Sequence, residues 1–323
     1  MMTSNPNDTL TSNDTLTSDD FDWVIPRPVQ MWLLTIIIIP SIACSVFHLY
    51  HLISKRILRE ALHNHPIIAI ICTIFLLQFI DIPLYINYLR LGYVWSETST
   101  FCIIWYNTDG PPIGVLISVI AEASLGRHIL IFHDKWLSTR KKRLLFHYIP
   151  LIITIAYPLI YTLSAQIFFK CIDSYPYDYT KVWCGYYPFC KDNTFFEQSL
   201  FYGNLVGGTI IAIIADIALI VRLIWKRHIR LRQPFVWKKY RKMTIQLLSV
   251  SIFCSSFNLP MLVYGVLIHE GIIPDIKSNG LYSVYFINCF GSLFVPIVMI
   301  RSLPKKYWWE KWWKTLVRRR QRQ

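Results

Sequence analysis

The sequence predicts an all-α protein: a bundle of seven transmembrane helices, with a short amphipathic C-terminal helix in the membrane interface. Of the 323 residues, 54% are hydrophobic and only 16% are charged, a composition too apolar for a soluble domain of this size. A helix needs roughly 17 to 25 apolar residues to cross about 30 Å of hydrocarbon. Seven such runs are present, at residues 29–53, 66–89, 103–132, 144–168, 200–225, 244–268 and 281–300.

The basic residues give this bundle a direction. The formal net charge is +14, and 27 of the 33 Lys and Arg residues fall in alternate segments between the apolar runs. Basic loops stay on the cytoplasmic side of a membrane. We therefore expect the N-terminus outside and the C-terminus inside, as an odd number of spans also requires. Because topology explains the basicity, the charge argues against nucleic-acid binding.

Three segments are expected along the chain. Residues 1–28 form a polar extracellular tail in which NDTLTS occurs twice, and each copy offers an N-glycosylation acceptor, at Asn7 and at Asn13. No apolar core precedes this tail, so we expect no cleavable signal peptide and insertion directed by the first span. Residues 29–303 form the seven-span domain, and residues 304–323 form the last helix with its basic tail.

The last segment predicts an interfacial helix. Helical spacing after Pro304 gathers four tryptophans, Leu316 and Val317 on one face, with Lys and Arg residues elsewhere. Such a helix lies in the membrane interface with its apolar face down. No cysteine follows Cys289, so tryptophan rather than a palmitoyl group is expected to anchor it.

Acidic residues stand inside three of the apolar runs, at Asp81, Glu122 and Asp216. A carboxylate at membrane depth is costly unless it is neutral, paired or hydrated, so these side chains should face the bundle interior. For Asp81 two interpretations stay open. It is either a structural residue satisfied by a proton or water, or a site for a cation or a proton.

The eight cysteines divide by position. Four lie within apolar runs, and the other four, Cys102, Cys171, Cys184 and Cys190, fall on the expected outer face. This division suits disulfides in an oxidising compartment and reduced thiols elsewhere. Three pairings are possible among four cysteines, and Cys102 with Cys190 or Cys184 would tie the third span to the long outer loop.

The bundle resembles a known receptor family. Trp95 stands seven residues before Cys102, and Arg127 stands twenty-five after it in the triplet Gly-Arg-His. Pro260 ends the motif Phe-Asn-Leu-Pro in the sixth span, and Pro296 lies in Val-Pro-Ile-Val-Met in the seventh. These features resemble the rhodopsin-like (class A) G-protein-coupled receptors, as a divergent orphan-type member. The usual Asn of span one, Trp of span four and Pro of span five are missing.

The resemblance implies that Arg127 and His128 form part of an activation switch. In the family an acid precedes the arginine, restrains it in the inactive state and releases it toward the G protein, but here Gly126 replaces that acid. Glu122 and Asp216 are the remaining acids in reach of an isolated cation, and we favour Asp216. If the usual restraint is absent, raised basal signalling is expected.

The resemblance also places a ligand pocket among the outer halves of the spans. Asp109 falls seven residues after Cys102, where amine receptors of the family keep an aspartate, whereas Asn258 and Met261 stand where those receptors place aromatics. An amine therefore fits less well than a peptide or another small molecule. Two prolines follow Asp109 closely and should kink or break the helix, so Asp109 is either a pocket residue or a solvated one at a frayed helix start. Pro260 and Pro296 would bend their helices and permit two arrangements.

These features predict a plasma-membrane receptor that binds an extracellular ligand and a heterotrimeric G protein, without a catalytic site, a metal or a cofactor. A transporter that uses Asp81, Glu122 and Asp216 is the first alternative, although no repeat relates the two halves of the chain. A histidine-rich membrane metalloenzyme is the second. Seven histidines between His48 and His147 fall near the cytoplasmic side, but no His-Glu-x-x-His motif occurs.

Overall fold

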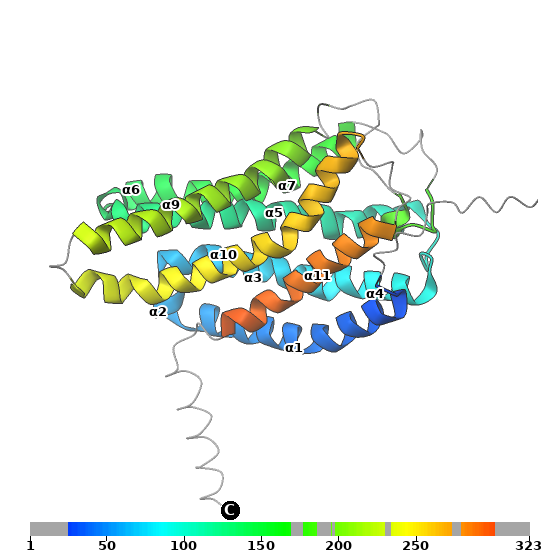
Figure 1. The fold of residues 1–323 in the computed structure, drawn as a ribbon, viewed down its shortest axis with the longest axis horizontal. Helices are drawn as coiled ribbons and strands as arrows, with labels where there is room; N and C mark the ends of the chain where they lie inside the picture. Colours follow the sequence, from blue (N-terminus) through cyan, green and yellow to red (C-terminus); the bar gives the residue numbers. More distant parts are fainter. Residues whose placement is uncertain are drawn as a thin grey trace, which may run out of the picture.

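The computed structural model is a helical bundle (Figure 1). It describes residues 25–168, 177–185, 195, 198–229, 234–272 and 279–300. Within these ranges every regular element is helical. Seven of the described helices are long and apolar enough to cross a membrane, so the chain is a multi-pass membrane protein in its architecture.

The seven membrane-crossing helices follow the predicted runs closely. Some consist of two or three consecutive elements that continue one another along the same axis. In chain order they are α1 (Arg27–Ser54); α3 (His65–Leu76), η2 (Leu77–Asp81) and α4 (Ile82–Leu91); α5 (Ser99–Phe132); α6 (Arg140–Arg143), η4 (Leu144–Tyr148) and α7 (Ile149–Phe168); η7 (Ser199–Val206) and α9 (Gly207–Ile229); α10 (Pro234–His269); and α11 (Asn279–Ile300). Short helices α2 (Arg56–Arg59), η1 (Leu62–Asn64), η3 (Asp134–Leu137) and η6 (Val182–Gly185) lie in the connections.

Helix α5 is longer at its start than the sequence predicted. It begins at Ser99, where the Thr98 hydroxyl caps the helix by accepting a hydrogen bond from the Phe101 backbone N–H. The helix continues through Pro111 and Pro112, so the expected break is wrong. Asp109 therefore lies three turns inside the helix and is buried, rather than solvated at a frayed end.

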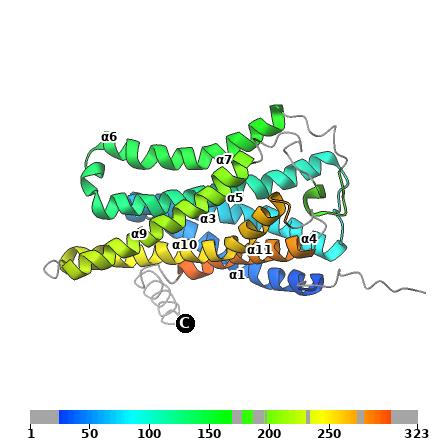
Figure 2. The same ribbon diagram turned by 45° about the horizontal axis from the view of Figure 1, so that its top comes forward.

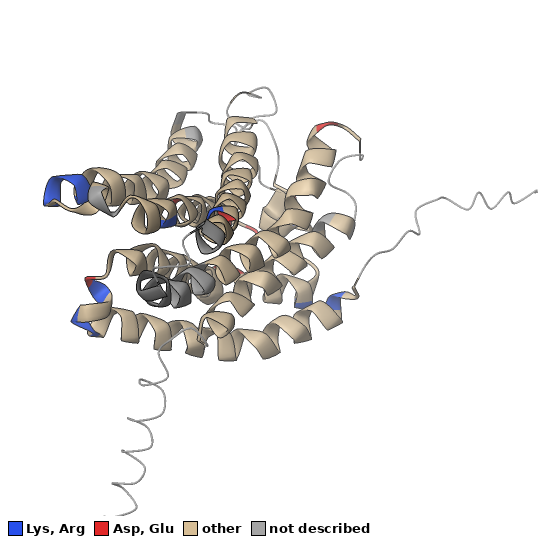
Figure 3. Cartoon of the chain, turned by 60° about the vertical axis from the view of Figure 1, so that its left-hand side comes forward, with Lys and Arg blue, Asp and Glu red and all other residues tan. Residues whose placement is uncertain are grey.

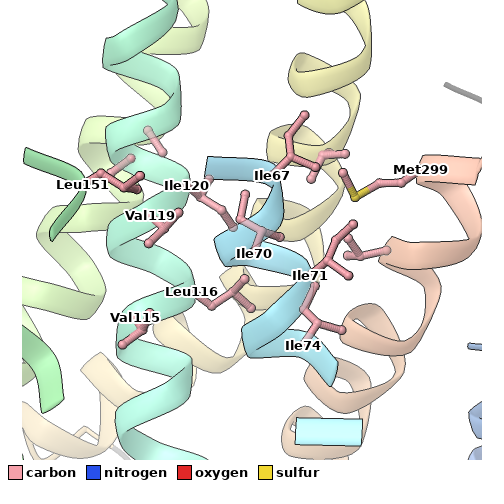
Figure 4. Close-up of a cluster of buried hydrophobic side chains, with 14 of the residues drawn as sticks. Ile67, Ile70, Ile71, Ile74, Val115, Leu116, Val119, Ile120, Leu151 and Met299 are labelled. Atoms are coloured by element: carbon pink, nitrogen blue, oxygen red, sulfur yellow. The ribbon is translucent and has the colours of Figure 1, made fainter. Parts of the chain in front are cut away.

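Helix α5 is also the central helix of the bundle. Its most apolar stretch is 56% buried, against 17% for the stretch that contains α7, and it contacts α3, α7, α9 and α10. Figure 4 shows Leu116 and Ile120 of α5 between that helix and α3, and the same cluster includes Ile70 and Ile74 of α3. This cluster buries aliphatic side chains between helices, which is the packing that holds a bundle together in lipid.

The outer surface of the bundle is apolar. Large hydrophobic side chains are exposed along α1, α7 and α9, and α7 runs along one edge of the bundle in Figure 2. Lys and Arg residues lie mainly at helix ends, with long uncharged stretches between them (Figure 3). The hydrocarbon core of a bilayer requires this arrangement, because exposed charge is tolerated only near the headgroups.

Glycine allows one unusually close contact between helices. A Cβ atom on Gly291 of α11 would lie only 2.3 Å from Cβ of Phe257 of α10. The absent side chain therefore lets α10 and α11 approach each other where Phe257 packs. A second glycine, Gly92, ends α4 in the left-handed conformation with φ of 81°, which favours glycine at a helix end.

Candidate functional site

Two polar groups stand out inside the bundle, one at each end. We call the end that carries the Cys102–Cys184 disulfide the disulfide end, and the opposite end of α5 the Arg127 end. Buried polar groups in an apolar bundle are costly and usually functional. We describe the Arg127 end first.

Arg127 lies near the last turns of α5 with only 2% of its surface exposed. Its Nε–H donates to the Ala123 carbonyl at 3.1 Å, and one terminal nitrogen donates to the Ser124 hydroxyl at 3.3 Å. The other terminal nitrogen lies 3.5 Å from a carboxylate oxygen of Asp216 on α9, which is also buried. Of the two acids that the sequence offered as partners, Asp216 forms the ion pair.

The neighbouring residues extend this contact between α5 and α9. The His128 ring nitrogen Nε2 lies 2.7 Å from the Ala215 carbonyl oxygen, and because a carbonyl only accepts, Nε2 carries the hydrogen. One turn further, the Arg222 guanidinium lies 4.4 Å from the centre of the Phe132 ring, at cation–π distance. We call these contacts of Arg127, His128 and Phe132 with α9 the α5–α9 seam.

Burial makes the ion pair of the seam consequential. A charged side chain at the centre of a bilayer costs from about 3 to more than 10 kcal/mol. Removing one partner of a buried pair typically costs about 3 to 5 kcal/mol, because the other charge is left unpaired. The pair is thus weak evidence for net stability but strong evidence that α5 and α9 have a preferred relative position.

One contact between described side chains links this region to α10. The Ser124 hydroxyl lies 3.5 Å from the Ser251 hydroxyl of α10. Glu122 is buried on α5 as well, but it forms no ion pair within the described residues, and its Oε2 accepts no hydrogen bond there. The structure thus joins α5 to α9 by charge and to α10 by a long hydroxyl contact.

At the disulfide end, three helices contribute to a buried acid pair. Asp81 of η2 is 1% exposed and Asp109 of α5 is 5% exposed. The Trp105 indole N–H donates to Asp81 at 3.0 Å. The Tyr285 hydroxyl of α11 lies 3.0 Å from the other oxygen of Asp81 and 2.9 Å from an oxygen of Asp109.

Hydrogen-bond geometry points to a proton held within this acid pair. A phenol has a single hydrogen to donate, yet the Tyr285 oxygen lies within hydrogen-bonding distance of both carboxyl groups. One contact is satisfied by the phenol hydrogen, so the other needs a hydrogen on Asp81 or Asp109. The sequence predicted that Asp81 faces inward and left Asp109 as either a pocket residue or a solvated one. It did not predict that the two acids meet, and it gave no signal for Trp105 or Tyr285.

A loop closes over the acid pair. The disulfide joins Cys102, near the start of α5, to Cys184 of η6, which is one of the two pairings expected for Cys102. Trp183 and Cys184 both adopt positive φ, and the Trp183 ring packs edge-on against Tyr285 with ring centres 4.8 Å apart. Trp183 of this loop therefore packs against the tyrosine whose hydroxyl contacts both acids.

A small cavity lies deeper, between α5, α9, α10 and α11. Its volume is about 30 Å³, enough for a water molecule but not for a drug-sized ligand. Asn258, Ser255 and Asn288 line it together with aliphatic residues, and no charged residue does. Of the expected pocket residues only Asn258 lines this cavity, whereas Met261 packs against the core cluster that contains Tyr285. Asp109 and Met261 do not line this cavity.

The seventh helix is held near its proline by a polar ladder from the first two. The Ser41 hydroxyl donates to the Leu293 carbonyl, three residues before Pro296. The Gln78 amide donates to Ser41 at 2.7 Å and accepts from Ser45 at 2.8 Å. Pro296 has no N–H to donate to the Ser292 carbonyl four residues before it, and Ser41 donates to the next carbonyl of that turn, that of Leu293. Pro260 and Pro296 lie inside continuous helices.

Other sequence-based expectations lie outside the described residues. These are the glycosylation acceptors Asn7 and Asn13, the cysteines Cys171 and Cys190, and the C-terminal helix at 304–323. Among the described residues, no three His, Cys, Asp or Glu side chains gather as metal ligands would. Two histidines do meet, with His65 Nδ1 3.0 Å from His147 Nε2.

Comparison with known proteins leaves the site to be interpreted from its own geometry. No protein-family model matches the chain, and a search of the curated proteins finds no match.

Proposed function

We propose that this chain is a G-protein-coupled receptor of the rhodopsin-like type, in the plasma membrane, with its N-terminus outside and its C-terminus in the cytosol. Seven apolar helices and the disulfide at the head of α5 are compatible with this proposal. The observation that carries it is the buried Arg127–Asp216 ion pair at the opposite end of α5. A guanidinium that is buried and tied to a neighbouring helix would supply the two-position element that signalling across a bundle needs, if the pair opened and closed.

The ion pair suggests how such a receptor would be restrained. In the arrangement described, Arg127 is directed at α9 and is hidden from water. Ligand binding would favour an arrangement in which the seam opens and the guanidinium becomes accessible to a G protein. Asp216 then replaces the acid missing at Gly126. We accordingly expect low basal signalling, in place of the raised basal signalling that an unrestrained Arg127 would produce.

The ligand proposed is a peptide or a small molecule without an essential ammonium group. Asp109 would be the natural partner of an amine, but it is buried, shares Tyr285 with Asp81, and lies under the Trp183 loop. An amine would have to displace these contacts before it reached a carboxylate. A neutral ligand does not pay this desolvation cost.

The decisive test is G-protein activation after Arg127→Ala. The chain is expressed with different tags on its two ends, and antibody access in intact cells locates each end. We expect opposite sides for the tags. Asp216→Asn, which removes the partner of the guanidinium, should raise nucleotide exchange on co-expressed G proteins, and adding Arg127→Ala should abolish most of that rise. Leu125→Ala is the matched control, because Leu125 lies two residues away and is 49% exposed. A rise that persists after Arg127→Ala is added, or both tags on one side, would refute the proposal.

One alternative is favoured by a specific observation, the buried acid pair of Asp81 and Asp109. Intramembrane carboxyl groups that hold a proton are found in proton relays of transporters. Purified protein in vesicles with an imposed pH gradient distinguishes the two functions. Cation uptake that depends on the gradient and disappears in Asp81→Asn would favour a transporter, whereas a receptor gives no uptake.

A further inference from the structure

Glu122 is a buried acid whose contacts do not explain its presence. It lies on α5 slightly more than one turn before Arg127 and is only 7% exposed. Its Oε2 accepts no hydrogen bond from any described residue. A buried carboxyl oxygen without a donor is rare in folded proteins and calls for an explanation. The charge that could satisfy it is the one that stands nearest along the same helix, on Arg127.

The residue between them leaves room for such a contact. A Cβ atom on Gly126 would lie 3.5 Å from Oε1 of Glu122, so this carboxyl group lies alongside the bare backbone of the following turn. The family's acid is therefore absent at position 126, while a carboxylate from one turn earlier lies next to that same position. Any larger side chain at 126 would compete with Glu122 for the space.

The guanidinium of Arg127 has more contacts with its own helix than with α9, which permits a second position of this side chain. Two of its three nitrogens bond to its own helix, to Ala123 and Ser124. Only one nitrogen reaches α9, and its 3.5 Å distance to Asp216 is at the upper limit of a hydrogen bond. A rotation of the side chain can break the contact with α9 and keep the guanidinium inside the bundle.

We propose that Glu122 is the second acceptor of Arg127. In the latched position the guanidinium pairs with Asp216 and holds α9. In the released position it pairs with Glu122 on its own helix, and α9 is free. The exchange moves one cation between two buried acids, so neither position leaves Arg127 unpaired. As a control of signalling this inference rests on the proposed function, but the exchange itself is a property of the bundle alone.

Three variants and two readouts test the exchange. Asp216→Asn, Glu122→Gln and the double variant are purified with the wild type in lipid nanodiscs. Hydrogen–deuterium exchange of the α9 backbone at residues 215–225 reports how firmly α9 is held. Guanine-nucleotide exchange on added heterotrimeric G protein reports basal activity. Glu60→Gln is the matched control, because Glu60 is an exposed acid that pairs with Arg56.

The two acids should act in opposite directions. We expect Asp216→Asn to speed α9 exchange and raise basal activity by about fivefold or more, the range of ordinary allosteric couplings. Glu122→Gln should slow α9 exchange and lower basal activity, because the released position loses its acceptor. The double variant should return toward the wild type. Glu122→Met, which replaces the carboxyl group without adding a polar one, should behave like Glu122→Gln.

The opposite result is equally clear. If Glu122 does not accept Arg127, Glu122→Gln will match the wild type in α9 hydrogen exchange and the double variant will match Asp216→Asn. The inference is then wrong. If α9 exchange follows the expected pattern while no variant activates a G protein, the two-position arginine stands and the receptor function falls. The two failures are thus separable.

Discussion

Asp178 organises the loop at the disulfide end through its carboxylate. The Thr180 hydroxyl and backbone N–H both donate to Asp178, and Lys181 pairs with it at 2.9 Å. The Thr180 hydroxyl first, and then Lys181, favour the ionised form and lower the pKa of Asp178 from 3.8 to about 2. The loop is therefore held by a charge that acid removes.

The sign of the pH effect follows from this lowered pKa. Because the folded protein binds the proton less readily than the unfolded chain, Asp178 contributes stability above pH 4 that is lost as the pH falls toward 2. Thermal unfolding between pH 5 and pH 2 measures it. Asp178→Asn should flatten part of this dependence, by a small amount because the side chain is partly exposed. An identical pH profile in the variant would contradict the role given to Asp178.

Single residues in the bundle show what the sequence could and could not predict. Asp81, Glu122 and Asp216 were expected to be buried because a carboxylate is expelled from lipid, and all three are buried. Their partners depend on how helices rotate about their axes, which is set by packing across the bundle. Asp216 could be favoured as the partner of Arg127 because few acids remained, whereas Tyr285 is one of many tyrosines.

At the scale of helices, the close contact of α10 and α11 gives a sharp prediction. Gly291→Ala places a methyl group 2.3 Å from Phe257 Cβ, so the helices must separate or Phe257 must move. Overpacking of this kind costs typically about 1 to 3 kcal/mol. We expect a lower thermal midpoint in detergent for Gly291→Ala.

The chain offers a matched control for this substitution. A Cβ on Gly203 would meet no atom within 4 Å, so Gly203→Ala should be neutral or slightly stabilising in its helix. Equal midpoints for the two variants would show that α10 and α11 do not pack as closely as described.

Helix positions were more predictable than helix details. Apolar runs located all seven spans because hydrophobic length alone decides whether a helix can cross lipid. The start of α5 was missed by several residues, since Ser99 to Cys102 are not uniformly apolar and the Thr98 cap is a local signal. The break expected at Pro111 and Pro112 does not occur, because neighbouring helices can hold a proline-containing helix together in a bundle.

For the molecule as a whole, the disulfide between Cys102 and Cys184 closes a covalent loop across 82 residues. Removing a native disulfide typically costs about 2 to 4 kcal/mol. Cys184→Ser should therefore lower the thermal midpoint, and peptide mapping without reductant should find the Cys102 and Cys184 peptides joined. In Cys190→Ser that link should persist. A Cys102 peptide joined to Cys190 instead would overturn the pairing.

The number and positions of the seven spans were accessible from the sequence, but the arrangement of the bundle interior was not. Charge alternation and seven runs predict an odd-numbered bundle without knowledge of any contact. The α5–α9 seam, the acid pair and the polar ladder to Leu293 each join residues at least 80 positions apart or on different helices. Such contacts follow from three-dimensional packing, for which a single sequence holds no direct signal.

Because Arg127 is buried, a protein that approaches this end of the bundle is attracted by other charges before it can contact the guanidinium. With 2% of its surface exposed, the guanidinium projects little field into the surrounding water. The four consecutive cations Arg140–Arg143 of α6 are exposed. They attract a protein partner with an acidic surface, over a range limited by the Debye length of about 8 Å in physiological salt. The long-range electrostatic attraction of such a partner therefore does not depend on whether the α5–α9 seam is open. The partner can distinguish the open seam from the closed one only after it has bound to this end of the bundle.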